Sequence, residues 1–189
     1  MDKEFAELTQ WMEALSTYET ILPERMPDIE LYMDQVITFL TRQLNVFSRD
    51  ELEKSITPSM INNYAKDGII PRPVHKKYNR THLSALLMLF SFKQVLPIGD
   101  IATFIDRNDP DHIFHQYETF RAIQDSAISQ TSGRITEMLR HINETKDEEG
   151  LKDLAMQLVT EANILSSVAK KILHILEKDE EPEKRTKDK

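Results

Sequence analysis

Side chains that can read nucleic-acid bases are gathered at the start of one short predicted helix. Residues 57–66 read Thr-Pro-Ser-Met-Ile-Asn-Asn-Tyr-Ala-Lys. An Asn side chain can pair bidentately with adenine, and a Met side chain can cover the methyl group of thymine. When such residues open a helix, the pattern is typical of contact with base edges in the major groove. The base-reading candidates are Ser59, Met60, Asn62, Asn63 and Lys66.

Positive charge is concentrated around the same stretch. From Lys54 to Lys93 the sequence carries seven Lys and Arg residues against one acid, Asp67, whereas the whole chain has a net charge of −8. A basic segment in an otherwise acidic protein is expected where a single face meets phosphate. The candidates for phosphate contact are Tyr64, Arg72, His75, Lys76, Lys77 and Arg80.

The local signals around these residues predict a helix-turn-helix with a short wing. Residues 48–52 open a short helix, and Thr57 caps a second helix that has Pro58 at its first position and ends at Gly68. Prolines at 71 and 73 bracket a short basic extended segment. Thr81 is expected to cap a third helix as far as Pro97. Its inward residues are predicted to be Leu83, Leu86, Leu87, Phe90 and Val95.

Helices are also predicted on both sides of this unit. Before it, one helix spans 2–18 and a second, capped by Asp28, runs to Leu44. After it, a short helix opens near Pro97 and ends near Asp106, and Pro110 starts a long helix over 111–145 with a softer, small and polar patch at 126–133.

The helix predicted over 151–177 has the most regular pattern. Its apolar residues recur as heptads over four repeats, which is typical of a coiled-coil seam. Glu161, at one of the inner positions, is expected to be a buried acid that sets the register. The sequence leaves open whether the seam pairs within one chain or between two. The seam residues are Leu151, Leu154, Leu158, Leu165, Val168, Ile172 and Ile175.

Composition excludes several other classes of protein. The chain of 189 residues has four Gly and no Cys, which favours helices and excludes disulfides, thiolate metal sites and cysteine nucleophiles. With no secretory signal and no long apolar run, a cytoplasmic location is expected. His112 and His115 have the spacing of metal ligands, with Asp109 and Asp111 just upstream, but neither makes a convincing third ligand, so no metal is predicted. No catalytic constellation or Gly-rich phosphate loop is present, so neither an enzyme nor a cofactor is predicted.

Several segments, in order, resemble the head of the MerR-type regulators. They are Thr57–Tyr64, Gly68–Pro71, Lys77–Leu83 and Leu96–Ile101, and the resemblance that they define covers under a third of the chain. The resemblance implies a winged helix-turn-helix that binds double-stranded DNA. The sequence departs from the family in two ways: about 45 residues precede the head, and the Arg that the family carries near the end of the recognition helix is replaced by Asn62. The whole chain also resembles a group of bacterial proteins of undefined function that carry this head internally.

These observations predict an all-α protein. The expected parts are an N-terminal helical extension (1–45), a MerR-like winged helix-turn-helix (46–107), a C-terminal helical hairpin or dimerisation region (108–178) and a disordered charged tail (179–189). The expected function is a sequence-specific DNA-binding transcriptional regulator, acting as a homodimer, with its recognition helix at about 58–67 and its wing at about 71–80. The alternative is an all-helical protein–protein interaction protein that uses the winged scaffold without binding DNA.

Overall fold

The part of the chain that the structure describes is mostly helical. This computed structural model covers all residues except 1, 48–55, 107, 146 and 187–189, and it describes side chains between Phe5 and Leu176 outside those gaps. The predicted all-α class is confirmed. The short helix predicted at 48–52 lies outside the described residues. The elements are α1 (Asp2–Ser16), α2 (Met33–Leu44), α3 (Pro58–Lys66), α4 (Arg80–Phe92), α5 (Ile98–Ile101), α6 (Pro110–Thr145) and α7 (Glu148–Thr186), with 3₁₀ turns at Pro23–Arg25, Asn45–Phe47 and Ala102–Phe104.

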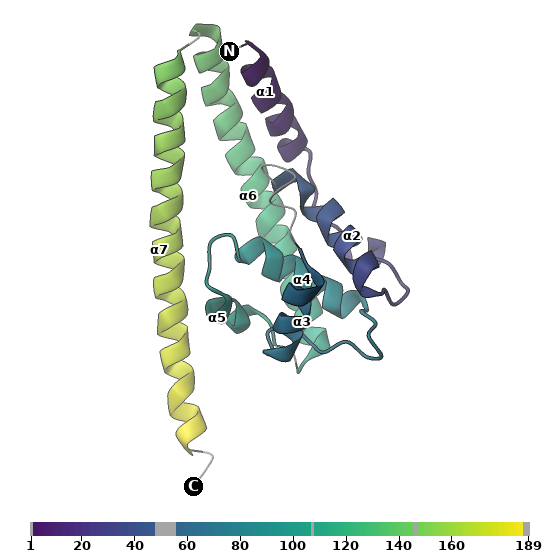
Figure 1. The fold of residues 1–189 in the computed structure, drawn as a ribbon. Helices are drawn as coiled ribbons and strands as arrows, with labels where there is room; N and C mark the ends of the chain where they lie inside the picture. Colours follow the sequence, from purple (N-terminus) through teal and green to yellow (C-terminus); the bar gives the residue numbers. More distant parts are fainter. Residues whose placement is uncertain (1, 48–55, 107, 146, 187–189) are drawn as a thin grey trace.

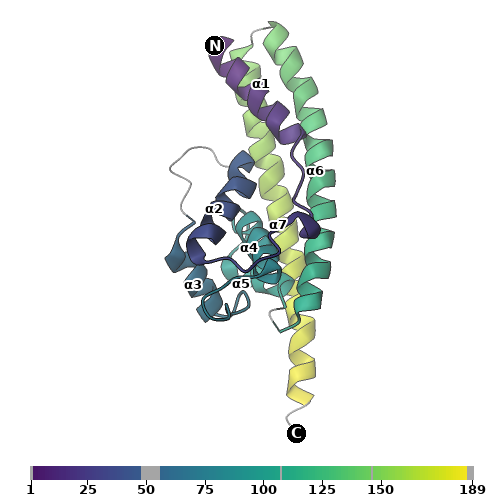
Figure 2. The same cartoon turned by 90° about the vertical axis from the view of Figure 1, so that its right-hand side faces the viewer.

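Two long antiparallel helices form the frame of the molecule. α6 and α7 are joined by a tight turn, and α1 packs along α6 near that turn (Figures 1 and 2). The shorter helices α2 to α5 gather around the other half of α6 as a compact head (Figure 1). None of the described helices is long and apolar enough to cross a membrane.

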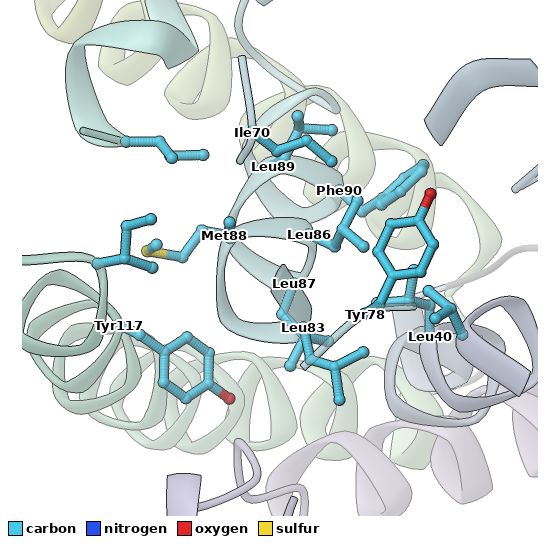
Figure 3. Packing of buried hydrophobic residues seen from close by; sticks show 14 of the residues in the cluster. Leu40, Ile70, Tyr78, Leu83, Leu86, Leu87, Met88, Leu89, Phe90 and Tyr117 are labelled. Atoms are coloured by element: carbon cyan, nitrogen blue, oxygen red, sulfur yellow. The ribbon is translucent and has the colours of Figure 1, made fainter. Parts of the chain in front are cut away.

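The head is built around α4. Every residue from Thr81 to Phe90 is buried, because α2 and α6 pack along this helix and Tyr64 of α3 meets Phe90. A helix that is covered on all sides needs apolar residues on all its faces, and residues 83–90 satisfy that requirement with only Ser84 as a polar exception. Tyr78 and Tyr117 close the core from the wing side and from α6 (Figure 3).

A second, smaller core holds α1 against the hairpin. Met12, Leu139 and Leu154, one from each of α1, α6 and α7, are buried together. The side chain of Arg134 on α6 bonds to both carboxylate oxygens of Glu161 on α7, at 3.3 and 2.7 Å. Glu161 is therefore a partly exposed ion-pair partner, not the buried acid predicted from its heptad position, and the pair fixes the register of the hairpin.

The start of α2 differs from the prediction. The helix begins at Met33, with Tyr32 as N-cap, and not after Asp28. The reason is a contact distant in sequence: the backbone N–H of Leu31 donates to the Tyr78 carbonyl (2.8 Å), and the Tyr78 N–H donates back (2.9 Å). This exchange of hydrogen bonds holds the residues before α2 in an extended conformation.

The bounds of α4 also differ from the prediction. Asn79 caps the helix, accepting from the His82 N–H at 3.3 Å, and the predicted cap Thr81 is a buried residue of the first turn. α4 ends at Phe92, so Val95 lies in the following loop and is 55% exposed, not inward as predicted. α6 continues as one helix through 126–133, and α7 carries helical backbone as far as Thr186.

Candidate nucleic-acid interface

α3 is bounded by the local signals that its sequence carries. The Thr57 hydroxyl accepts from the Met60 N–H at 3.3 Å, and Pro58 occupies the first helical position, where no N–H is needed. At the other end Gly68 has a φ of 75°, and the Ile69 N–H donates to the Tyr64 carbonyl at 2.8 Å. This is a Schellman closure with glycine in the left-handed conformation. The predicted cap and stop are both confirmed.

One face of α3 is polar and exposed. Ser59, Asn62, Asn63 and Lys66 are exposed, and their spacing of three and four residues places them on the same side of the helix. Ile61, on the opposite side, is fully buried against the head. The fifth base-reading candidate, Met60, is half-buried and packs against the core. Four of the five candidates therefore share one accessible surface, which we call the α3 face.

Tyr64 lies between α3 and α4. Its ring is half-buried and meets Phe90 edge-on, with ring centroids 6.0 Å apart. Burial raises the pKa of its hydroxyl. The aromatic contact anchors α3 on the head, one of the two roles that the sequence offered for this residue, and a phosphate contact by its hydroxyl stays a prediction.

The segment after α3 forms a very short hairpin. The Lys77 N–H donates to the Val74 carbonyl at 2.9 Å, and the two residues between them, His75 and Lys76, have φ of 50° and 63°. Two successive residues of positive φ are the pattern of a type I′ hairpin turn. Val74 is exposed beside the turn. We call residues 71–78 the wing; it lies next to α3 at the lower end of the head (Figure 1).

The base of the wing is held by two contacts. The Leu31–Tyr78 backbone pair joins its returning arm to the segment before α2. On the entering arm, the ring nitrogen Nε2 of His82 lies 3.2 Å from the Arg72 carbonyl, while Nδ1 accepts from the Asn79 N–H at 3.2 Å. Burial, opposed by the Arg72 carbonyl and by Glu30, lowers the pKa of His82. Sequence analysis did not single out this histidine, because it placed the cap of the helix at Thr81 and not at Asn79, three residues before His82.

The predicted phosphate contacts divide into two groups. Arg72, His75 and Lys76 are exposed. Lys77 has its ammonium 3.6 Å from a carboxylate oxygen of Glu30 and 5.8 Å from the centre of the Tyr32 ring. Arg80 is half-buried and donates from Nε to the carbonyl of Pro27 at 3.2 Å. Glu30 and Pro27 lie about fifty residues earlier in the chain, so these two contacts could not be predicted from the local sequence.

The remaining candidates belong neither to the α3 face nor to the wing. Leu151, Leu154 and Leu158 pack in the second core, whereas Leu165, Val168, Ile172 and Ile175 are exposed. His112 and His115 are exposed on the first turns of α6. Among the described residues no group of three or more His, Asp or Glu side chains is arranged to hold a metal ion.

One comparison with known proteins coincides with the head. A family model described as a domain of unknown function, DUF1836, matches residues 21–121. The chain belongs to the DUF1836 family. The match begins and ends where the core of the head does, since that core draws on side chains from Ile21 to Phe120. The DUF1836 domain is therefore the head together with the first third of α6, and α1 and α7 lie outside it. No curated protein and no solved structure gives a significant match.

Proposed function

We propose that this DUF1836 protein is a sequence-specific DNA-binding transcriptional regulator. The observation that carries the proposal is the α3 face. Ser59, Asn62, Asn63 and Lys66 stand exposed on a helix whose other side is locked into the head by Ile61. In helix-turn-helix proteins the recognition helix has this division, with the polar face in the major groove and the apolar face on the core.

The wing supports the proposal through its charge and rigidity. Arg72 and Lys76 project from a short hairpin beside α3, where cations contribute affinity by contacting the phosphate backbone. The hairpin turn and the His82–Arg72 contact hold these cations in place. In this arrangement the phosphate contacts of the wing orient the protein on the duplex and add affinity, and the base contacts of α3 determine which DNA sequence is bound.

The test is selection of genomic fragments by the purified full chain at moderate salt. We expect enrichment of fragments that share a short site. The double variant Asn62→Ala/Asn63→Ala should lose this site preference while it retains its fold, since both side chains are exposed. The matched control is Asn143→Ala/Asn163→Ala, which removes two exposed amides from α6 and α7 and should select the same site as the unaltered protein.

Charge reversal provides a second arm of the same experiment. Lys76→Glu/Lys77→Glu should abolish retention of duplex DNA of any sequence, because the wing would then repel phosphate. If neither this variant nor the asparagine variant differs from the unaltered chain, the assignment to DNA binding is wrong.

The second candidate function is a protein–protein interaction module built on the same scaffold. The observation that favours it is the reduced number of free cations at the wing: Lys77 is paired with Glu30, Arg80 at the start of α4 bonds inward, and the apolar Val74 is exposed at the turn. Under this alternative, duplex DNA binds no more tightly than the roughly 10⁻⁴ to 10⁻⁶ M typical of non-specific contact at physiological salt. The fragment selection would then return no common site.

A further inference from the structure

The apolar stripe of α7 is covered over only half of its length. Leu151, Leu154 and Leu158 lie in the second core with α1 and α6. Beyond Glu161 the same heptad positions continue, but their side chains are 50–70% exposed. We call this exposed stripe the open face of α7. It consists of Leu165, Val168, Ile172 and Ile175, flanked by Ile164 and Leu176.

The open face is uncovered although α7 is fixed against the head. The Ser166 hydroxyl donates to the carbonyl of Val95 at 3.4 Å. Leu173 lies seven residues further, on the same side of the helix, and is only 4% exposed. α7 therefore contacts the head through the side that carries Ser166 and Leu173. The open face lies on a different side of the helix and is not covered by the head.

An apolar side chain of α6 is exposed at the matching level of the hairpin. Ile123 lies eleven residues before Arg134, and Ile172 lies eleven residues after Glu161. Eleven residues are about three helical turns, so both isoleucines share a side with the ion pair that joins the helices. A hairpin of constant separation would bring Ile123 onto Ile172. Instead they are 64% and 53% exposed, because the helices spread apart toward this end (Figure 1).

We propose that a second copy of this chain covers the open face. The stripe continues, in the same heptad register, an interface that is already packed in the second core. Soluble monomers rarely leave a contiguous apolar patch of more than a few hundred Å² exposed. Six large apolar side chains of α7 are each at least 50% exposed here, so this face is a candidate for cover by a partner.

The residue types at the seam indicate how the two copies meet. Leu165 occupies an a position, and Val168 and Ile175 occupy d positions. Leu at a with Ile at d favours assemblies of more than two helices. Two copies supply four helices at this contact, α6 and α7 from each. The inference does not depend on the proposed function, because the contact lies on the long helices and leaves the α3 face free.

The first test measures the mass of the full chain in solution by sedimentation, without DNA. We expect about twice the chain mass of 22.1 kDa. Val168→Glu/Ile172→Glu should return the mass to that of one chain, with unchanged helical circular dichroism. The matched control, Ser167→Glu/His174→Glu, adds the same charges to the outer side of α7 and should remain dimeric. A single-chain mass for the unaltered protein, or a dimer that survives the open-face variant, overturns the proposal.

The second test uses the absence of cysteine from the sequence. Single substitutions Leu165→Cys, Val168→Cys, Ile172→Cys and Ile175→Cys are oxidised in turn, with Ser167→Cys as control. A two-fold contact over the open face predicts a disulfide-linked dimer for at least one of the four and none for the control. In Ile123→Cys/Ile172→Cys, a link formed within a single chain, together with a single-chain mass, would mean that the hairpin closes on itself and that no second copy binds.

Discussion

The imidazole Nε2 of His82 lies 3.2 Å from the backbone carbonyl oxygen of Arg72. This contact ties the first turn of α4 to the arm that enters the wing. His82 also completes the cap of α4, because its Nδ1 accepts from the Asn79 N–H. One buried ring therefore supports both a helix and the wing on which the proposed phosphate contacts depend.

Because burial lowers the pKa of His82, the stability of the head should depend on pH. The unfolded chain takes up a proton at about pH 6.5, whereas the folded protein does so only at lower pH. Stability should be complete above that value and should fall as the pH decreases below it, since the unfolded state then binds more protons. Urea titrations between about pH 7.5 and 5.5, on either side of that value, measure this slope at fixed ionic strength.

The variant His82→Gln provides the control for that slope. A Gln three residues after an N-cap completes a capping box without titrating, so this variant should keep the cap of α4 and flatten the pH dependence. Any carboxylate contribution is common to both proteins and cancels in the difference. Equal slopes for the unaltered protein and for this variant would contradict the assignment.

The N-cap of α3 should be measurable as a single hydrogen bond. Thr57→Ala removes the hydroxyl that accepts from the Met60 N–H and should lower the free energy of unfolding by about 1 kcal/mol. Thr57→Ser keeps the oxygen and should remain close to the unaltered protein. The denaturant midpoints of the unaltered protein and the two variants measure this difference in stability. An alanine variant as stable as the serine variant would exclude a stabilising role for this cap.

The two cores should respond separately to truncation. Leu86→Ala, at a fully buried position in α4, should cost about 2–5 kcal/mol and loosen the whole head. Leu154→Ala removes a contact of the second core and should accelerate hydrogen exchange in α1 and near the α6–α7 turn, while the amides of α4 remain protected. Equal acceleration in α4 would mean that the molecule opens as one unit.

Trp11 offers an independent readout of the second core. It is the only tryptophan in the chain, it lies on α1, and its indole N–H donates to the Val46 carbonyl at 2.9 Å. Its fluorescence should change when α1 detaches from the hairpin. In Leu154→Ala, the denaturant midpoint seen by fluorescence should therefore fall below the midpoint seen by helical circular dichroism, whereas coincident midpoints would mean that α1 does not detach separately.

Most features determined by neighbouring residues were predicted from the sequence, although the cap of α4 was placed at Thr81 instead of Asn79, and features determined by distant contacts were not. Thr57, Pro58 and Gly68 act within one turn of α3, and all three were identified. The start of α2 was misplaced because Asp28 is a good cap by type, while the deciding bond joins Leu31 to Tyr78, far along the chain.

The candidate site divides in the same way. The α3 face follows from helical spacing alone, so its exposed residues were predictable. The environment of Lys77 was not, because Glu30 belongs to a segment that reaches the wing only in the folded chain. The heptads of α7 were predicted from the sequence. The point along α7 at which their side chains become exposed was not, because it depends on how α6 and α7 spread apart.

The pairing of Lys77 with Glu30 leads to a graded prediction for DNA binding, which rests on the proposed function. Lys76→Gln should weaken binding to all sequences and reduce the slope of log K against log salt by about 0.9, the effect of one lost phosphate contact. Lys77→Gln should have a smaller effect, because its ammonium is already 3.6 Å from a carboxylate. Glu30→Gln should strengthen binding and steepen the slope, since it releases Lys77 toward phosphate. Fluorescence anisotropy with a labelled duplex at several salt concentrations measures all three, and equal slopes for the two lysine variants would show that Glu30 does not compete with DNA for Lys77.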